Sequence, residues 1–553
     1  MALFVDRAQL ASKQFEATEA QRSIVERICS ILENSPLAVE LVAPRVRSMP
    51  VEHVLGVLER EGTDTSIDAL VRASYELLGE NARRLFERLS VFPALFTAEA
   101  ARDICSGGDL EPWDVTDAID ELVVANLIKR FDAAEASRYL VVDSARFYGR
   151  EVLRERLERA AIQWRYIRYF RALARRGAAR LEAGNAESGI DEVRGDLENV
   201  EGALEYALGR RVDIAAGTDI VIALHRFWVE TGRLSEGRHW TNLALASGIP
   251  LGPQMAELLY AAATIAHYSG EMLPLADLSE RLVAYHERGQ DPLALARALN
   301  GLANARFRLG QTPSAKKLYQ RALKEYRKAA DRKGQALVLM NLGSLAAETM
   351  TDILAAREAF SESLSLFREL GMSSRTGSAL SNLSALSIAE GDYEQALVYA
   401  NEALIIFERL GNNPQATIAL LHIAHTRLER GETDLSRATL VAARERLRRE
   451  ATIRNAIHFH EILFLYACEC EAFDRAAMIL GHLETLRANN RLPRTAASIA
   501  ESAQRELKTQ ARLGKAYEGR VESGRGFSPQ EMERIVDGVL SAPAAVDVAT
   551  AAR

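Results

Sequence analysis

Small and apolar positions between residues 254 and 490 recur with a period of about 40 residues. One position that stays small is occupied by Ala315, Ala356, Ala396 and Ser436. A second such position, with the same steps of 41, 40 and 40 residues, is occupied by Ala322, Ser363, Ala403 and Ala443. Turn glycines follow the same period at Gly270, Gly310, Gly391 and Gly431, with Thr351-Asp352 in the one repeat that lacks a glycine. Independent series that share one period predict an array of paired helices.

Residues 382–404 show how one repeat is built. Leu383 and Ser384 lie on its first helix, and Gly391 opens the turn to its second helix. Ala396 and Ala403 are small where neighbouring helices approach closely, so the segment resembles a tetratricopeptide repeat. The period exceeds the usual ~34 residues, which makes each helix about one turn longer. Because one helix pair cannot bury its apolar face alone, about six stacked pairs should form a superhelix with a concave groove.

Residues 65–153 have a different pattern, in which helical periodicity gives way to two short apolar runs. We expect four helices, at residues 66–78, 81–91, 97–105 and 115–126. Two strands should follow, at residues 127–131 and 138–142, joined by the polar turn 132–137. Helices followed by a β-hairpin are typical of a winged helix. The sequence therefore predicts a mainly α protein, with a small winged-helix module followed by an α-solenoid superhelix of tetratricopeptide-like repeats.

Composition adds few constraints. Hydrophobic residues make up 48% of the chain and charged residues 26%, as in ordinary soluble proteins. The net charge of −7 gives no overall attraction to nucleic acid or to an anionic membrane. Four cysteines in 553 residues are too few for a disulfide framework. No basic N-terminal segment leads into an apolar run, and no stretch approaches ~18 apolar residues, so we expect a cytoplasmic protein without a membrane span.

Several phrases are similar to those of the bacterial STAND regulators, which are NB-ARC or AP-ATPase-like signal-transduction ATPases with tetratricopeptide sensors. Residues 3–8 resemble the start of the helical ARC subdomain, and residues 34–41 (NSPLAVEL) resemble a motif within it. The other similar phrases, in the approach to the winged helix, the first sensor helices and the C-terminal region, are residues 73–78, 89–92, 227–240 and 524–528. The resemblance spans nearly the whole chain. It implies a transcriptional regulator in which the repeats sense a signal.

The phosphate-binding loop of these ATPases, G-x-x-x-x-G-K-[ST], does not occur in the sequence. The nearest text, Gly514-Lys515, lacks both the upstream glycine and the following Ser or Thr. Without this loop there are no converging backbone N–H groups and no lysine to hold phosphates. We therefore expect the chain as it stands to bind no cofactor and not to hydrolyse ATP. The alternative is that it forms the C-terminal half of a complete ATP-dependent switch, whose nucleotide fold would precede residue 1.

Two positions match nucleotide contacts of the family in part. Pro36 falls on the proline that packs against adenine, although Asn34 stands near it where the family has glycine. Asp143 falls on the aspartate of the Met-His-Asp sensor, but Val142 replaces the histidine. The resemblance thus implies that Pro36 and Asp143 contact a nucleotide only within a longer parent chain. In this chain, helix capping and core packing are the simpler roles.

The patterns and the resemblance divide the chain into five regions. Residues 1–64 correspond to a remnant of the ARC-like helical subdomain, and residues 65–153 to a winged-helix-like domain. Residues 154–253 form a helical segment leading into the sensor, and residues 254–490 form the repeat array. Residues 491–553 hold two helical patterns and an Ala-rich, frayed tail.

Two segments bear on nucleic-acid binding. The would-be recognition helix of the winged-helix module, residues 113–126, has four acidic residues and no Lys or Arg, so DNA phosphates would repel it. Its acidic residues are Asp114, Asp117, Asp120 and Glu121. The helix predicted at residues 163–176 interleaves aromatic residues with five arginines, a composition that could stack on bases and bind phosphates. An aromatic stripe at helical spacing is more often core with a solvated arginine flank, and we favour that interpretation.

Histidines and cysteines near the end of the array raise the question of a metal site. The residues concerned are His422, His425, His458, His460, Glu461, Cys468 and Cys470. Metal ligands must converge on one face, but His458 and His460 point to different helix faces, as do Cys468 and Cys470. We expect buried cysteines and groove-lining histidines rather than a metal site. No Ser/His/Asp, paired-carboxylate or Cys/His constellation stands out, so no catalytic residue is assigned and no enzyme activity is expected.

The predicted function is that of a signal-sensing and ligand-binding regulatory module of a signal-transduction ATPase-type transcriptional regulator, itself without nucleotide hydrolysis. Its groove would bind a protein, a peptide or a small effector, and the winged helix would couple occupancy to an upstream ATPase domain. Besides the C-terminal half of a complete switch, a DNA-binding regulator that uses the arginine-rich helix 163–176 stays open as an alternative. We expect no membrane partner and no direct nucleic-acid binding.

Overall fold

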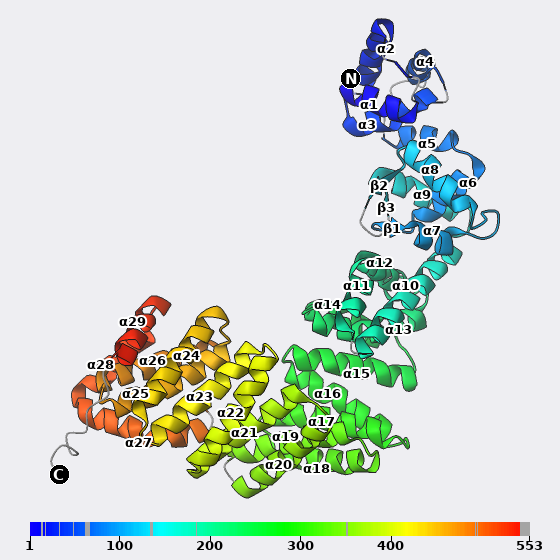
Figure 1. Cartoon of the computed structure of the whole chain (residues 1–553). Coiled ribbons are helices and arrows are strands. Elements are labelled where there is room, and N and C mark those ends of the chain that lie inside the picture. Colours follow the sequence, from blue (N-terminus) through cyan, green and yellow to red (C-terminus); the bar gives the residue numbers. More distant parts are fainter. Residues whose placement is uncertain are drawn as a thin grey trace, which may run out of the picture. The chain divides into compact units, whose positions relative to one another are not determined.

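The computed structural model describes residues 1–12, 15, 16, 18–32, 34–47, 49–60, 67–132, 137–183, 185–349, 352–490, 492, 494 and 496–541. The chain divides into two compact units, Met1–Leu278 and Ser279–Arg553 (Figure 1). The division falls inside helix α16 (Met272–His286). Within the described ranges, every helix is too short or too polar to cross a membrane.

Four α-helices and a 3-10 turn begin the first unit. They are α1 (Ala2–Ala11), α2 (Glu19–Ile31), α3 (Pro36–Val42), η1 (Ala43–Arg47) and α4 (Val51–Arg60). Thr18 and Gln21 start α2 with a capping box, in which each side chain accepts a hydrogen bond from the other residue's backbone N–H. Ser35 caps α3, and Pro36 occupies the first position of that helix, where a missing N–H costs nothing.

The next part of the first unit combines helices with a small sheet. Its elements are α5 (Ile67–Glu76), α6 (Glu80–Leu89), β1 (Phe96–Thr97), α7 (Ala98–Cys105), α8 (Asp114–Val124), β2 (Ile128–Phe131), β3 (Arg138–Val141) and α9 (Asp143–Glu155). The strands pair antiparallel in the order β1-β3-β2, with Ile128 opposite Val141 and Phe96 opposite Tyr139. The predicted hairpin is thus confirmed, although Ser66 and most of the predicted turn, residues 133–136, lie outside the described residues. Strand β1 was not predicted, because two residues show no alternation.

Helices complete the first unit. They are α10 (Arg159–Glu182), α11 (Ala186–Arg194), α12 (Leu197–Leu204) with the π-turn η2 (Glu205–Gly209), α13 (Ile214–Glu230), α14 (Leu234–Ala246) and α15 (Pro253–Tyr268). An aromatic cluster joins α10 to the region of the sheet: the ring centre of Tyr166 lies 5.2 Å from that of Phe92 and 5.7 Å from that of Tyr206. Both Phe92 and Tyr166 are buried, so this cluster is part of the core.

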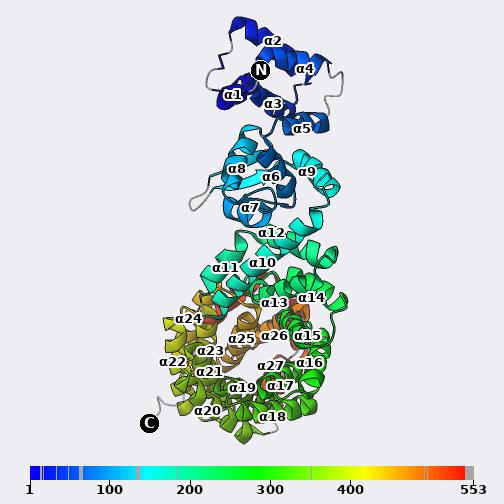
Figure 2. The ribbon, with the colours of Figure 1, turned by 90° about the vertical axis from the view of Figure 1, so that its right-hand side faces the viewer.

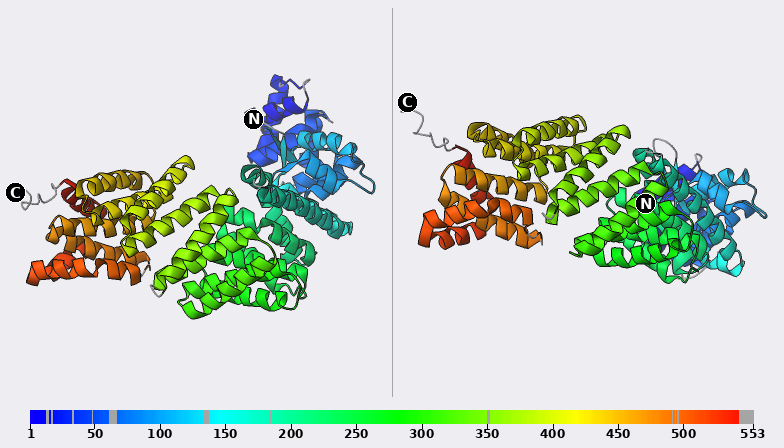
Figure 3. Two further views of the ribbon diagram at one scale, coloured as in Figure 1. Left: turned by 60° about the horizontal axis from the view of Figure 1, so that its bottom comes forward. Right: turned by 90° about the horizontal axis from the view of Figure 1, so that it is seen from below.

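The second unit holds the repeats as antiparallel helix pairs (Figures 1 and 3). The first helices of the pairs are α17 (Pro292–Arg308), α19 (Arg332–Thr349), α21 (Ser373–Glu390), α23 (Asn413–Glu429) and α25 (Ile453–Glu469). The second helices are α18 (Thr312–Lys328), α20 (Ile353–Glu369), α22 (Tyr393–Arg409), α24 (Thr433–Arg449) and α26 (Phe473–Asn490). These helices are 17 or 18 residues long, so the extra turn inferred from the 40-residue period is confirmed.

The predicted register of the repeats is confirmed at both small positions, whose side chains are all fully buried. Small hydroxyls there also bond across the helix pair: Ser363 Oγ donates to the Ala336 carbonyl at 2.8 Å, and Ser436 Oγ to the Ala424 carbonyl at 2.7 Å. All four turn glycines have φ between 73° and 77°, a conformation that costs glycine little. In the repeat without a glycine, Asp352 caps α20 by accepting a bond from the Ala355 N–H, while Thr351 lies outside the described residues.

Beyond the array lie α27 (Ala496–Leu513), the 3-10 turn η3 (Gly514–Ala516), α28 (Tyr517–Arg525) and α29 (Pro529–Ser541). The sequence predicted two helical patterns here, and the structure has three helices; residues 542–553 lie outside the described residues. Helices α26 and α28 cross where Gly481 and Gly524 leave no room for a Cβ against the facing backbone. Helix α29 adds Met532, Val536 and Val539 to the buried core of the last repeats. The phrase at residues 524–528 therefore has a structural role, in close packing and in the Ser528 cap of α29.

Candidate functional site

Helix α27 lies against the first helices of the repeats. It packs on α19, α25 and α26, and its side chains reach α23 (Figures 1 and 2). The residues that receive it are His425 and Glu429 of α23 together with Glu461, Cys468 and Glu469 of α25, and we call this set the α27-binding surface. Several of its members are charged and are buried or half-buried.

His425 lies at the centre of this surface. Its Nε2 is 2.9 Å from Glu501 Oε1 of α27 and 3.5 Å from Glu429 Oε1 of its own helix. Burial alone would lower the pKa of His425, but the hydrogen bonds to Glu429 and Glu501 outweigh burial and raise that pKa to about 9. The same bond to His425 lowers the pKa of Glu429. At neutral pH the group is therefore an imidazolium between two carboxylates.

A second charged contact lies one helical turn further along α27. Arg505 Nη2 donates to Glu429 Oε1 at 2.8 Å and lies 4.0 Å from Glu469 Oε2. Beyond it, the Thr509 hydroxyl lies 3.3 Å from the Cys468 sulfur. Glu501, Arg505 and Thr509 thus follow one line along α27, at a spacing of four residues.

The N-terminal end of α27 is held by a third polar contact. Ser498 Oγ donates to Glu461 Oε1 at 2.8 Å, and Arg487 of α26 forms an ion pair with the same carboxylate. Burial lowers the pKa of Arg487, while Glu461 opposes that effect. The contact between α27 and the repeats consequently consists of hydrogen bonds and ion pairs over most of its length. Near its C-terminal end, Lys508 and Arg512 lie over the Phe473 ring of α26.

The neighbouring histidines form two separate ring pairs. The ring centres of His422 and His458 are 5.4 Å apart, and those of His460 and His482 are 5.1 Å apart. The prediction that His458 and His460 point to different helix faces is therefore confirmed. Burial lowers the pKa of His458, and burial with the nearby His482 lowers that of His460 to about 4. Among the residues that the structure describes, no three His, Cys, Asp or Glu side chains are arranged to hold a metal ion.

Asparagine side chains form a hydrogen-bonded group on the first helices at the start of the array. Asn341 Nδ2 donates to Asn300 Oδ1 and to Asn304 Oδ1, both at 3.2 Å, and the Tyr319 hydroxyl donates to Asn304 Oδ1 at 2.6 Å. The asparagines are half-buried. Sequence reasoning missed them, yet the 41-residue steps from Asn300 to Asn341 and on to Asn382 could have revealed a third periodic series. An amide offers both a donor and an acceptor, as a peptide backbone requires.

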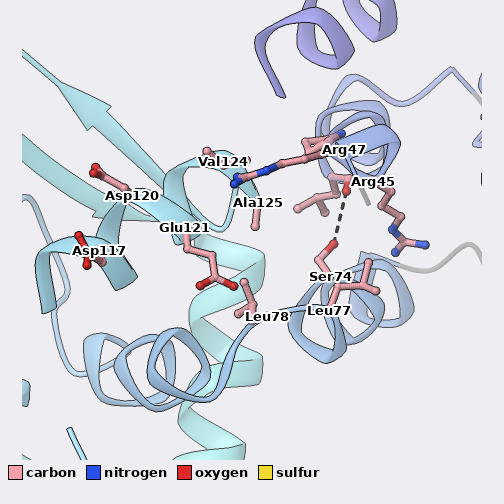
Figure 4. A pocket seen from close by; sticks show the side chains of 12 residues that line it. Arg45, Arg47, Ser74, Leu77, Leu78, Asp117, Asp120, Glu121, Val124 and Ala125 are labelled. Carbon is pink, nitrogen blue, oxygen red and sulfur yellow. Dashed lines mark hydrogen bonds between the residues drawn. The ribbon is translucent and has the colours of Figure 1, made fainter. Parts of the chain in front are cut away.

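The first unit contains a cavity of about 580 Å³ (Figure 4). Its wall residues come from α3, η1, α5, α8 and the turns next to α5 and α8: Leu41, Pro44, Arg45, Arg47, Ser74, Leu77, Leu78, Asp117, Asp120, Glu121, Val124 and Ala125. Several polar groups there already have partners, since Arg45 donates to the Leu70 carbonyl and Glu121 accepts from the Gly79 N–H at 2.7 Å. Figure 4 shows Arg47 reaching toward Val124 and Ala125, with Asp117 and Asp120 further along α8. The cavity is thus lined by charges of both signs over an apolar base.

The two positions assigned from the family resemblance lie on helix N-termini. Pro36 begins α3 and is exposed, and Asn34 before it has a positive φ of 55°. Asp143 begins α9, is exposed and forms an ion pair with Arg146. Neither residue lines the cavity of Figure 4. A nucleotide contact by Pro36 or Asp143 stays a prediction about a longer chain.

The arginine-rich segment 163–176 lies within α10. Tyr166 and Phe170 are fully buried, which confirms the core interpretation for them, whereas Trp164 is half exposed and departs from it. The Arg168 guanidinium lies over the Trp164 ring, 5.1 Å from its centre. The other arginines of the segment have protein partners, with Arg165 bonded to the Ser106 carbonyl, Arg171 and Arg175 paired with Asp219, and Arg176 paired with Glu192. The arginines of the segment 163–176 are therefore engaged within the protein.

Residues 294–369, which lie within α17 to α20, match the tetratricopeptide repeat family. Over 259 residues the chain is 29% identical to "Putative HTH-type transcriptional regulator Rv0890c" of Mycobacterium tuberculosis, covering 44% of this chain and 29% of that protein. Over 186 residues it is 30% identical to "Uncharacterized protein Rv0894" of the same organism, covering 31% of this chain and 46% of that protein. The chain spans less than half the length of these curated relatives.

One solved structure resembles this chain over most of its length. It is the STAND protein with a tetratricopeptide repeat sensor, PH0952, from Pyrococcus horikoshii, with a TM-score of 0.43 and 15% sequence identity. The match covers 94% of this chain and 73% of that chain. The comparisons and the helix pairs together establish a mainly α chain that carries tetratricopeptide repeats and is homologous in part to a protein named as a transcriptional regulator.

Proposed function

We propose that this chain is the ligand-sensing part of a signal-transduction ATPase-type transcriptional regulator, and that its repeats bind a protein or peptide segment along their first helices. The observation that carries the proposal is that these helices already bind a helix, α27, through His425, Glu429 and Glu461. The periodic asparagines on α17 and α19 give the same helices amide groups, which can donate to and accept from a peptide backbone. The tetratricopeptide match and the regulator homologue support a regulatory role.

The first unit would couple occupancy of the repeats to an upstream ATPase domain. The α5–α9 region combines helices with a β-hairpin, which supports its assignment as the winged helix that the family resemblance implies. Its helix α8 carries Asp114, Asp117 and Asp120, which disfavour contact with DNA phosphates. We therefore assign this region a regulatory role rather than direct DNA recognition.

The binding proposal can be tested by selecting ligands from a random peptide display library on the immobilised full chain. Selected peptides should bind the Asn300→Ala/Asn341→Ala variant about tenfold more weakly, which corresponds to ~1.4 kcal/mol of lost contacts. Val398→Ala is the matched control, because Val398 is exposed on the second helix α22. Failure to select any peptide, or selected peptides that bind the asparagine variant as well as wild type, would contradict ligand binding on the first helices.

The chain itself should hydrolyse no nucleotide, because its sequence lacks a phosphate-binding loop. Phosphate release from Mg-ATP should equal that of buffer alone. Hydrolysis by the purified chain that the Asp143→Ala substitution abolishes would contradict this part of the proposal and favour a nucleotide-dependent switch.

A further inference from the structure

Helix α27 is amphipathic, yet it docks on the repeats through its polar side. Thr509 is buried beside Cys468 of α25 and Ser502 is buried with Arg494 as its partner, whereas Ile499 is 48% exposed and Leu507 is 66% exposed. An amphipathic helix of a stable domain normally does the reverse and buries its apolar stripe. The attachment of α27 therefore gains little from the hydrophobic effect.

The helices that follow α27 are attached in a different way. Gly481 and Gly524 bring α26 and α28 into backbone contact, and Met532 and Val536 of α29 are buried in the apolar core. Separating α28 or α29 would open that core. Separating α27 would uncover charged and hydroxyl groups, which water can solvate, and the single Phe473 ring under Lys508 and Arg512. We therefore expect that α27 can leave the surface while the rest of the unit stays folded.

The α27-binding surface has a definite charge pattern. His425 presents a positive charge to Glu501, and the carboxylates of Glu429 and Glu469 face Arg505. Glu501 and Arg505 are four residues apart, which places them on the same side of a helix, one turn apart. Any helix with an acidic residue followed four positions later by arginine offers the same two contacts.

We propose that the surface formed by His425, Glu429 and Glu469 is a docking site for a partner helix with this acidic–arginine spacing, and that α27 occupies the site until such a partner displaces it. The inference rests on the proposed function, since it names the partner class and the regulation of the first-helix surface. Because α27 is part of the same chain, its effective concentration is in the millimolar range. A partner must therefore add contacts beyond these two charges. The amides of Asn300 and Asn341, which now bond to each other, can supply them by exchanging partners.

The test uses a fluorescein-labelled synthetic peptide of Ala496–Leu513 as the probe and the full chain as the receptor. Glu501→Gln/Arg505→Gln loosens the resident helix without changing the surface, so the probe should bind this variant at least about tenfold more tightly than wild type. Gln504→Ala, at an exposed position of α27, is the control and should bind the probe as wild type does. A probe in which Glu501 and Arg505 are both replaced by glutamine should not bind, and adding His425→Gln to the receptor should remove the gain.

A disulfide that holds α27 on the surface, called the lock below, provides a second test. Thr509→Cys in a Cys470→Ser background places a thiol beside Cys468, at a site where the present atoms are 3.3 Å apart. After oxidation, the cross-linked chain should lose all probe binding, and reduction of the same sample should restore it. The locked and reduced states share one sequence, so a folding defect cannot produce this difference.

The proposal is overturned if the loosened variant binds the probe no better than wild type, or if the oxidised lock still binds it. Peptides from the display selection distinguish this failure from failure of the proposed function. Suppose that the selected peptides need Asn341 but bind the locked and the reduced chain equally well. That result would overturn the proposal that α27 exchanges with a partner, and it would still support the sensing role. If no peptide is selected even on the loosened variant, although the probe binds it tightly, the surface accepts only helices like α27. That result would support the docking site and contradict wider ligand sensing.

Discussion

Helices α27 and α28 follow the same repeat array and dock beside each other, but by opposite chemistry. Helix α28 meets α26 backbone to backbone at Gly481 and Gly524, where no side chain fits. Helix α27 meets the repeats through Glu501 and Arg505 and leaves its apolar residues exposed. Close packing and apolar burial fix a helix, whereas partly hydrated ion pairs contribute little net stability. Two helices in one small region are thus attached differently, and we infer that α28 is a permanent part of the fold whereas α27 is exchangeable.

The largest effect is expected at the permanent contact. Gly524→Ala places a methyl group against the Met478 carbonyl, so it should lower the free energy of unfolding by about 3 kcal/mol, measured as a shift of the urea midpoint. Gly519→Ala on the same helix is the matched control, because nothing lies within 4 Å of its added Cβ. It should be neutral or slightly stabilising. Equal midpoints for the two variants would show that the α26–α28 crossing is not close-packed.

A smaller loss is expected within the array itself. Ala396 is fully buried at the first small position of the repeats, so Ala396→Leu should overpack the helix pair and cost about 2 kcal/mol. The thermal midpoint of the variant reports this loss. Val398→Leu, at an exposed position of the same helix, should leave the midpoint unchanged. An unaltered midpoint for Ala396→Leu would mean that the repeat register is wrong.

A substitution at the contact between α27 and the repeats should change the free energy of unfolding only slightly. Arg505→Gln removes the bonds to Glu429 and Glu469 and should change the global free energy of unfolding by less than about 1 kcal/mol. Gln510→Ala, at an exposed position of α27, serves as the control. If Arg505→Gln lowered the free energy of unfolding as much as Gly524→Ala does, α27 would be a permanent part of the fold.

The α27 contact should also depend on pH. The groups that face His425 are Glu429 and Glu501, with Arg505 bonded to the same Glu429 and His422 and His458 nearby. Because the pKa of His425 is raised to about 9, its stabilisation is complete below the unfolded pKa of about 6.5 and is lost as pH rises toward 9. The difference in unfolding free energy between wild type and His425→Gln, from urea titrations, should shrink over that interval. A difference that grows with pH would contradict the charged state assigned to His425.

The regular part of the fold was predictable from sequence, and the site only in part. Buried positions such as Ala396 and Ala403 repeat every 40 residues, so their spacing reveals both the helices and their register. The partnership of α27 with α23 was not predictable, because a helix that docks by polar residues leaves no apolar period pointing toward its partner. His425 and His458 were noticed, but only the fold shows that Glu501, 76 residues after His425, completes the contact. The cavity beside Arg47 likewise depends on how separate helices meet.

Hydrogen exchange of the intact chain, followed by mass spectrometry at neutral pH, tests directly whether α27 leaves the α27-binding surface. We predict that the amides of α27 exchange far faster than those of α28, α29 and the adjoining α23, and that the oxidised Thr509→Cys lock slows α27 to their rate. If α27 in the wild-type chain is as protected as α28, the helix is a fixed part of the fold and the first helices have no exchangeable occupant.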